Sequence, residues 1–390
     1  MPYGQRMLKT IPEIDALHSE MTEWRRDIHR NPELAFTETR TAALVAGRLR
    51  EWGLDPVEGI GGTGVVAVID SGKPGPSVAL RADMDALPMD DAGGKAWHSH
   101  TSGIAHACGH DGHTAVLLGT ARHLAANPPA SGRVVLVFQP AEENGLGARA
   151  MIADGLLERF AFDEAYAFHN MPLLAPGQAG VRTGPTLNGY VVWEITVEGV
   201  GGHGAAFFKA TDPLQAAARL AVEISSIVGR YLDPADSGLI TVCSLQAGSS
   251  HNVIPASATL SGTLRALRPE VIDLLYRRLE AACAGVATLS GCTITCRRLA
   301  EVPPCVNAPE GAERAAAACA AVLGEAAVIR DHPPFPFTDD FALFLEAAPG
   351  AYLFLGQDSA MCHNPAYDFD DALLPVAASI FATLVRQRLG

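Results

Sequence analysis

Ala107-Cys108-Gly109-His110-Asp111-Gly112-His113 gathers a thiol, two imidazoles and a carboxylate within seven residues. An apolar run with helical spacing follows from Thr114 to Ala126, which predicts a tight loop that opens a helix. Glycine lets a backbone approach an ion closely, and the amino end of a helix favours a thiolate over a thiol. A lone buried cysteine or histidine usually fills core space, but four potential ligands together indicate a metal site. Because a hydrolytic metal site needs at least three protein ligands and an open position, further ligands are expected elsewhere in the chain.

The composition indicates a globular protein with more than one domain. The chain has 390 residues, which is long for a single hydrophobic core, and 48% of them are apolar. A net charge of −14 argues against nucleic acid or an anionic membrane as the main partner, although a local arginine can still hold a small anionic substrate. Eight cysteines accompany a first segment without an apolar signal region, and no apolar stretch reaches membrane-spanning length. We therefore expect a cytoplasmic protein with reduced cysteines.

Two aspartates follow a predicted strand near the start of the chain. Residues 64–70 and 77–81 are short β-branched runs that are predicted to pair with one another, and two helices are predicted before them, an amphipathic one at residues 11–30 and a second at about 37–52. Asp83 and Asp85 come directly after the second run and share a face by the two-residue period of a strand. Open α/β sheets place their sites at this edge. A functional role is expected for Asp85, whereas for Asp83 a solvated acidic turn is an equal alternative.

Two further predicted strands end in candidate ligands. Residues 133–139 (RVVLVFQ) form a continuous apolar run, typical of a buried parallel strand, and Glu142 and Glu143 follow it. Adjacent carboxylates at such a strand end repel one another unless a cation offsets their charge. Since neighbouring side chains point in different directions, one can bind a metal while the other faces a reacting water. A strand at residues 165–170 contains His169 near its end, which makes it a third sheet-edge element with a ligand.

The pattern of elements changes at about Thr186. Strands at 190–197, 239–245, 258–267 and 293–299, with helices at 212–228 and 269–289, predict a small ferredoxin-like α+β domain. The α/β pattern then resumes, and His363 lies in a loop near the end. We therefore expect an α/β fold with a mostly parallel central sheet flanked by helices, built from residues 1–185 and 301–390, with an inserted smaller domain at 186–300.

Together these segments resemble the M20 metallopeptidase superfamily, specifically its amidohydrolase branch. That branch includes hippurate hydrolases, plant indole-acetyl-amino-acid hydrolases and bacterial N-acyl-amino-acid deacylases. The matching segments run in order along almost the whole chain: HRNPEL, RADMDALP, HACGHDGHTA, FQPAEE, AFHNMP, GVGGH, HNVIP, GTLR, DDFALFLEAAPGAYLFLG and HNP. The resemblance implies metal-dependent hydrolysis of the amide bond of N-acyl amino acids, which releases a carboxylic acid and a free amino acid.

The resemblance also implies a site with two divalent metal ions per subunit. The implied ligands are Cys108, His110, Glu143, His169 and His363. Cys108 would bridge the ions in place of a carboxylate, Glu142 would be the general base, and Asp85 would orient groups near the site. Other branches of the superfamily place a histidine ligand where Asp83 stands, so Asp83 is not counted as a ligand. Thiolate, imidazole and carboxylate donors suit zinc, manganese, cobalt or nickel.

The inserted domain is implied to be a lid and a dimerisation domain of a homodimer. His203 of one subunit would reach the site of the other and polarise the scissile carbonyl, while Asn252 and Arg265 would hold the substrate carboxylate. The family usually continues Ala-Ala-x-Pro-His after this histidine, but here the chain reads Gly-Ala-Ala-Phe-Phe-Lys. Phe207-Phe208-Lys209 is therefore predicted to lie where the lid meets substrate and to alter the acyl or amino-acid preference.

Three rival hypotheses remain at this stage. A carboxypeptidase or dipeptidase on the same scaffold would differ only in the acyl side of its substrate. A thiol enzyme would use Cys108 as nucleophile and His110 as base, but residues two apart make a poor pair, and the glutamate pair is left unexplained. A metal-binding scaffold without catalysis would show damage to the base or the ligands, and the sequence shows none.

Overall fold

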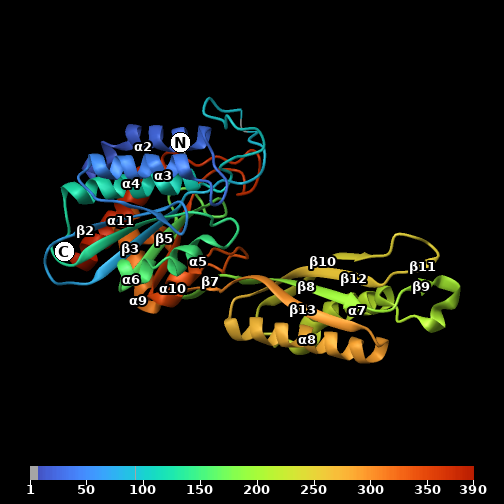
Figure 1. Cartoon of the computed structure of the whole chain (residues 1–390). Coiled ribbons are helices and arrows are strands. Elements are labelled where there is room, and N and C mark those ends of the chain that lie inside the picture. The colour runs from blue at the N-terminus through green and yellow to red at the C-terminus, as the bar shows by residue number, and fades with distance from the viewer. Residues whose placement is uncertain (1–7, 93) are drawn as a thin grey trace. The chain divides into compact units, whose positions relative to one another are not determined.

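The computed structural model describes residues 8–92 and 94–390, which form two compact units (Figure 1). The first unit comprises the chain up to Thr186 together with Val306–Pro333 and Asp339–Gly390. The second comprises Leu187–Cys305 and Pro334–Thr338. In sequence, therefore, the second unit interrupts the first.

The first unit is built on an eight-stranded sheet with the order β1-β2-β4-β3-β5-β16-β6-β15. Its four central strands, β4, β3, β5 and β16, run parallel, which confirms the predicted parallel centre, whereas β2 and β6 flank them in the antiparallel sense. The strand bounds are β1 Val57–Ile60, β2 Gly64–Asp70, β3 Ser77–Asp83, β4 Arg133–Gln139, β5 Glu164–Met171, β6 Ala179–Gly180, β15 Val328–Ile329 and β16 Gly350–Gly356. Parallel strands end at one edge of a sheet, so the segments after β3, β4 and β5 meet there.

The predicted pairing of residues 64–70 with 77–81 is wrong. Strand β4 lies between β2 and β3: it is antiparallel to β2, with Val66 opposite Val137, and parallel to β3, with Leu80 opposite Leu136. The physical reason is burial. All residues of β3 and all but the first of β4 are buried, so both strands gain most from a central position with helices on each face.

Helices cover both faces of this sheet, with α2, α3 and α4 on one side and α5, α6 and α10 on the other (Figure 1). The bounds are α1 Pro12–Asp15, α2 His18–Arg30, α3 Thr39–Glu51, α4 His110–Ala126, α5 Gly147–Ala153, α6 Leu156–Arg159, α9 Pro309–Leu323, α10 Ala342–Ala347 and α11 Leu373–Leu389. The single helix predicted at residues 11–30 is in fact two, α1 and α2. Ile14 and Met21, on either side of the break, are both fully buried, so the apolar periodicity continues through the turn that separates them.

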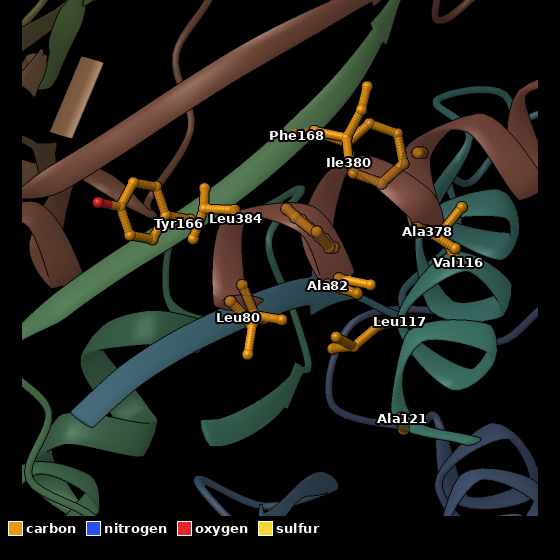
Figure 2. Packing of buried hydrophobic residues seen from close by; sticks show 14 of the residues in the cluster. Leu80, Ala82, Val116, Leu117, Ala121, Tyr166, Phe168, Ala378, Ile380 and Leu384 are labelled. Carbon is orange, nitrogen blue, oxygen red and sulfur yellow. The ribbon is translucent and has the colours of Figure 1, made fainter. Parts of the chain in front are cut away.

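The main core of the first unit lies between the sheet and the helices α4 and α11. Figure 2 shows side chains of these elements in contact: Leu80 and Ala82 from β3, Tyr166 and Phe168 from β5, Val116, Leu117 and Ala121 from α4, and Ala378, Ile380 and Leu384 from α11. Burial of apolar surface stabilises a fold by about 25 cal/mol per Å². This core therefore holds the start of α4, where the cysteine and histidines lie, firmly against the ends of the strands.

The second unit has a four-stranded antiparallel sheet with the order β10-β12-β8-β13. The bounds are β8 Gly189–Glu198, α7 Pro213–Tyr231, β10 Gly238–Ala247, β12 Ser257–Ala266, α8 Pro269–Ser290 and β13 Thr293–Val302. Helices α7 and α8 form one core with this sheet around Trp193, so the predicted β-α-β-β-α-β order is observed. A small β-pair, β9 (Gly202–His203) and β11 (Val253–Ile254), with the 3-10 helix η1 (Gly204–Lys209), extends from one end of the unit (Figure 1).

The remaining short elements are β7 Gly184–Leu187, β14 Cys305–Asn307 and the 3-10 helix η2 Glu325–Ala327. Among the helices of the described residues, none combines the length and apolar character needed to cross a bilayer.

Candidate active site

The five predicted metal ligands converge at the carboxyl edge of the first unit's sheet. The Cys108 Sγ lies 3.3 Å from the His169 Nε2, and the His363 Nε2 lies 3.2 Å from the Glu143 Oε2. The His110 Nε2 is 3.8 Å from the Glu143 Oε1. Ligand atoms of the Cys108-His110-His169 set lie within 4.8 Å of one another, and so do those of the Cys108-Glu143-His363 set. These two three-residue sets overlap at the Cys108 thiol.

The backbone around these ligands is specialised. Gly109, which precedes α4, has a φ of 98°, and a Cβ at this position would lie 2.2 Å from the Asn170 Oδ1, so only glycine fits. Among the described residues, the non-glycine residues with positive φ are Phe36, Ala141 and His363. Ala141 directly precedes the glutamate pair, and His363 is itself a predicted ligand. Such left-handed backbone costs roughly 1–3 kcal/mol per residue and is concentrated at functional sites, where surrounding contacts hold it.

Asp85 holds two of the ligands in place. Its backbone carbonyl and its Oδ1 lie 3.0 and 3.2 Å from the His110 Nδ1, which donates to them. In the neutral ring this leaves the Nε2 lone pair for a ligand role. The Asp85 Oδ2 accepts a hydrogen bond of 3.0 Å from the Glu143 N–H. One buried carboxylate thus contacts both a histidine and a glutamate of the cluster.

The donor set fits divalent cations. The His110 Nε2 and the Glu143 Oε1 are buried and have no hydrogen-bond partner among the described residues. Buried polar atoms are rarely left without a partner, and a cation would satisfy both. A hydrogen bond with Cys362 and burial raise the pKa of the Cys108 thiol well above its usual value. A coordinated cation would favour the thiolate over the thiol. Imidazole, thiolate and carboxylate donors together suit first-row transition metals.

Glu142 lies beside this cluster with an acidic environment of its own. Its side chain is 10% exposed, and its Oε2 is 3.9 Å from the His110 Nε2. Burial, followed by the charges of Asp339 and Glu143, raises the pKa of Glu142 well above its usual value. The carboxylates of Glu142, Asp339 and Asp340 also lie within 4.8 Å of one another. A carboxylate with high proton affinity next to the ligands is suited to accept and donate a proton.

Asp83 is buried, so the alternative of a solvated acidic turn is wrong. Its Oδ2 lies 2.5 Å from the Nη1 of the buried Arg81, whose Nη2 also lies 3.1 Å from the Asp339 Oδ1. The Asp83 Oδ1 is 2.6 Å from the His113 Nδ1. Although burial opposes ionisation, the charge of Arg81 and that of His110 hold the pKa of Asp83 well below its usual value. Arg81 therefore offsets the negative charge that collects behind the site.

Several residues of this second layer were not assigned a role from the sequence. His113 lies one helical turn after His110, and its Nε2 is 2.7 Å from the Asn170 Oδ1. The Asn170 Nδ2 donates to the Tyr367 hydroxyl at 2.6 Å. The spacing of the two histidines in HDGH is a signal that both lie on the same helix face. Nothing in the local sequence, however, indicated the partners from β5 and the C-terminal loop.

Glu38 is a further buried carboxylate that sequence reasoning did not single out. Its Oε1 accepts hydrogen bonds from the Phe36 N–H at 3.0 Å and the Ala141 N–H at 2.9 Å, and the Thr63 hydroxyl donates to its Oε2. Phe36 and Ala141 are two of the three positive-φ residues named above. Glu38 thus ties the turn before α3 to the strained residue that precedes the glutamate pair.

The three residues predicted to contact substrate from the inserted domain all lie in the second unit. His203 pairs with Val253, and the Gly204 N–H donates to the Asn252 carbonyl at 2.9 Å, so His203 and Asn252 are neighbours. Arg265 lies on β12, eight residues from Ser257, and donates to the Thr338 Oγ1 at 2.8 Å. At about 3.3 Å per strand residue, Arg265 is roughly 25 Å along β12 from the end nearest Asn252. One copy of the second unit therefore does not bring Asn252 and Arg265 to the same carboxylate.

A sequence profile described as Peptidase family M20/M25/M40 matches residues 79–387. The chain belongs to this family. Its relatives include the hippurate hydrolase of Campylobacter jejuni, which is 39% identical over 383 residues and covers 98% of this chain and 100% of that protein. The N-acetyl-L-cysteine deacetylase of Bacillus subtilis is 35% identical over 380 residues, covering 96% of this chain and 89% of that protein.

A solved M20 structure has the same fold over nearly the same length. A Bacillus subtilis protein described as a dinuclear metal binding peptidase from the M20 family matches with a TM-score of 0.84 at 30% identity, covering 96% of this chain and 99% of that one. Membership of the M20 peptidases makes this chain a hydrolase of amide bonds, and its described residues hold candidate sets of metal ligands.

Proposed function

We propose that this chain hydrolyses N-acyl amino acids to a carboxylic acid and a free amino acid, with Cys108, His110, Glu143, His169 and His363 as metal ligands and Glu142 as general base. The similarity to a hippurate hydrolase and to an N-acetyl-L-cysteine deacetylase over nearly the full chain supports this substrate class. The observation that carries the proposal is the position of Glu142. It is the one glutamate of the pair that faces a cluster of carboxylates, while Glu143 contacts His363.

When bound, the two divalent ions supply the Lewis acidity that lowers the pKa of water and polarises a carbonyl. Glu142 takes the proton from the attacking water and transfers it to the leaving amine nitrogen as the amide bond breaks. Asp85 accepts hydrogen bonds from the His110 Nδ1 and from the Glu143 N–H, and so would hold both residues in position as ligands. Arg81, held among three carboxylates, limits the electrostatic cost of so many acidic groups in one buried place.

We further propose a homodimer in which the second unit acts as lid and dimerisation domain. His203 and Asn252 would come from one subunit, and Arg265 from the other. The separation of Asn252 and Arg265 along β12 supports this arrangement, since both groups would otherwise be too far apart for one substrate. His203 would polarise the scissile carbonyl, and Arg265 with Asn252 would hold the substrate carboxylate. Zinc or manganese is the proposed metal, and the cytoplasm is the proposed location.

Phe207 and Phe208 bear on the choice of acyl group. Both lie in η1 directly after His203, with 68% and 73% of their surfaces exposed, and their rings meet edge to face at 6.0 Å. If His203 reaches the scissile carbonyl, this aromatic pair lies close to the substrate. We propose that the pair favours aromatic or long apolar acyl groups.

The first test is hydrolysis by metal-stripped protein reloaded with zinc or manganese. The substrates are N-acetyl, N-benzoyl and long-chain N-acyl amino acids, with plain dipeptides beside them. Metal-restored cleavage of the acyl amino acids is expected, whereas cleavage of dipeptides alone would assign the chain to the peptidases. Glu142→Gln should keep its two metal ions and lose turnover. Unchanged turnover in that variant would exclude Glu142 as the base.

The second test asks whether two subunits complete one site. His203→Ala and Arg265→Ala should each abolish most activity when pure. After unfolding and refolding as a mixture, the mixed dimer contains one site with both an intact His203 and an intact Arg265. Activity should therefore return in the mixture. No return of activity, with mixed dimers verified by differently tagged chains, would refute the shared site.

A further inference from the structure

Cys362 lies against the predicted bridging ligand without being one of the ligands. Its Sγ lies 3.9 Å from the Cys108 backbone carbonyl oxygen, and the two thiols are close enough for each to shift the pKa of the other. The His363 N–H donates to the Ala107 carbonyl at 2.7 Å, so the two chain segments are fastened together next to the cysteines. The Asn170 Nδ2 donates to the Cys362 Sγ at 3.8 Å. Within the described residues, Cys362 belongs to none of the ligand sets around the site.

The two thiols differ in access. Cys362 is half-buried, whereas the Cys108 side chain is buried with 8% exposure. A small oxidant from solvent therefore reaches Cys362 first. Cys108 is the nearest group that can then react with the oxidised sulfur.

We propose that Cys108 and Cys362 form a dithiol pair that hydrogen peroxide converts to a disulfide, which withdraws Cys108 from the metal site and inactivates the enzyme reversibly. The proposal rests on the ligand role of Cys108 in the proposed function. In the first step the Cys362 sulfur attacks one peroxide oxygen, the O–O bond breaks, and a sulfenic acid and one water form. In the second step the Cys108 sulfur attacks the sulfenic sulfur, the S–S bond forms, and a second water leaves. Two thiols are oxidised and one peroxide is reduced to two waters.

Loss of Cys108 would affect the whole site. In the proposed arrangement Cys108 belongs to both ligand sets, so neither ion keeps its full coordination. His363 directly follows Cys362 and has strained backbone with a φ of 65°, so a bond at its neighbour would also disturb this ligand. Metal loss is the expected consequence. Reduction by a dithiol and addition of metal should restore the original site.

The experiment treats zinc-loaded wild-type protein with hydrogen peroxide and measures three quantities: cross-linked peptides by mass spectrometry, released zinc by a chromophoric chelator, and hydrolysis. The test variant is Cys362→Ser, whose hydroxyl can still accept the hydrogen bond from Asn170. The matched control is Cys243→Ser, because Cys243 is an exposed cysteine on β10 in the other unit. Untreated Cys362→Ser is expected to hydrolyse substrate like the wild type.

Wild type and Cys243→Ser should both yield a peptide pair that joins Cys108 to Cys362, release zinc in step with it, and recover after dithiothreitol and zinc. Cys362→Ser should retain its zinc at the same peroxide dose. Absence of the joined peptides from wild type would overturn the proposal, as would their formation without zinc release. Equal zinc release from Cys362→Ser, reversed equally by dithiothreitol, would also overturn it. The cross-link and the zinc readout need no substrate, so they stand apart from the test of hydrolysis.

Discussion

Replacement of Glu38 by alanine is expected to impair turnover although Glu38 is not a metal ligand. The structure places its carboxylate between two strained residues, where it accepts the N–H groups of Phe36 and Ala141. A hydrogen bond to a charged group contributes roughly 1.5–3 kcal/mol, so two of them amount to about 3–6 kcal/mol. Removing a buried carboxylate also removes its desolvation cost, which offsets part of the loss. The net decrease in the free energy of unfolding is then about 2–4 kcal/mol, or a Tm lower by roughly 4–8 °C.

The catalytic effect follows from what the hydrogen bond holds. Ala141 is fully buried with a φ of 54°, and its N–H has no acceptor once Glu38 is gone. The peptide would relax toward negative φ and displace the next residue, Glu142. A misplacement of about 1 Å in a catalytic group can cost on the order of 100-fold in rate. We expect kcat to fall roughly 10- to 100-fold while KM changes little, because substrate contacts lie elsewhere.

Steady-state kinetics and thermal unfolding of metal-loaded protein check this expectation. Glu38→Gln keeps an acceptor oxygen and should recover most of the lost kcat. Glu51→Ala is the matched control at the other end of α3, because Glu51 is exposed and pairs with Arg48 at the surface; the stability of this variant should change by less than about 0.5 kcal/mol. A folded Glu38→Ala protein that turns over substrate like wild type would refute the reasoning. A Glu38→Gln protein as slow as Glu38→Ala would show that the acceptor oxygen is not what matters.

Three further predictions test the surroundings of the site and the second unit. Arg81→Met leaves three buried carboxylates without their counter-charge, so chemical denaturation should show a loss of roughly 3–5 kcal/mol, with Arg81→Lys less affected. Burial opposes protonation of His29, but the charge of Asp111 raises the pKa of His29 above the usual 6.5. The protonated ring therefore contributes fully to stability below pH 6.5, and this contribution is lost as the pH rises through the raised pKa. Unfolding of His29→Gln should depend less on pH in this window than unfolding of the wild type. In Gly262→Ala, the new Cβ would lie 1.9 Å from the Thr241 carbonyl oxygen, so circular dichroism should show the second unit unfolding at a lower temperature. The control Ser261→Ala, at the neighbouring residue, should have little effect on that temperature.

The site was predictable from sequence where its ligands lie close to strand ends or in one short loop. The pair Cys108 and His110 falls in a single loop, and the pair Glu142 and Glu143 follows one apolar strand. Parallel strands end at the same edge, so local patterns alone predict that these groups meet. His363, by contrast, lies in a loop without a strand to mark it, and its assignment depended on the family resemblance.

The order of strands in the sheet was harder to predict from the sequence than the site residues were. The runs at 64–70 and 77–81 are close in sequence, and a short turn rich in glycine and proline favours pairing between them. The structure inserts β4 instead, because burial of two apolar strands at the centre outweighs the short connection. Such competition between local and long-range pairing depends on the total buried area, which no local pattern reports.

The sequence by itself determined the candidate ligand types, the adjacent glutamates, and the β-α-β-β-α-β order of the inserted domain. Hydrophobic periodicity, the positions of glycines and side-chain chemistry are local properties, so they can be recognised directly from the sequence. Only the tertiary structure decided which buried groups support that chemistry. Glu38 meets Ala141 across more than a hundred residues, and Cys362 meets Cys108 across more than two hundred. These contacts form because packing of the sheet and its helices brings together residues that are far apart in the chain. No local sequence pattern marks the two residues of such a pair as partners.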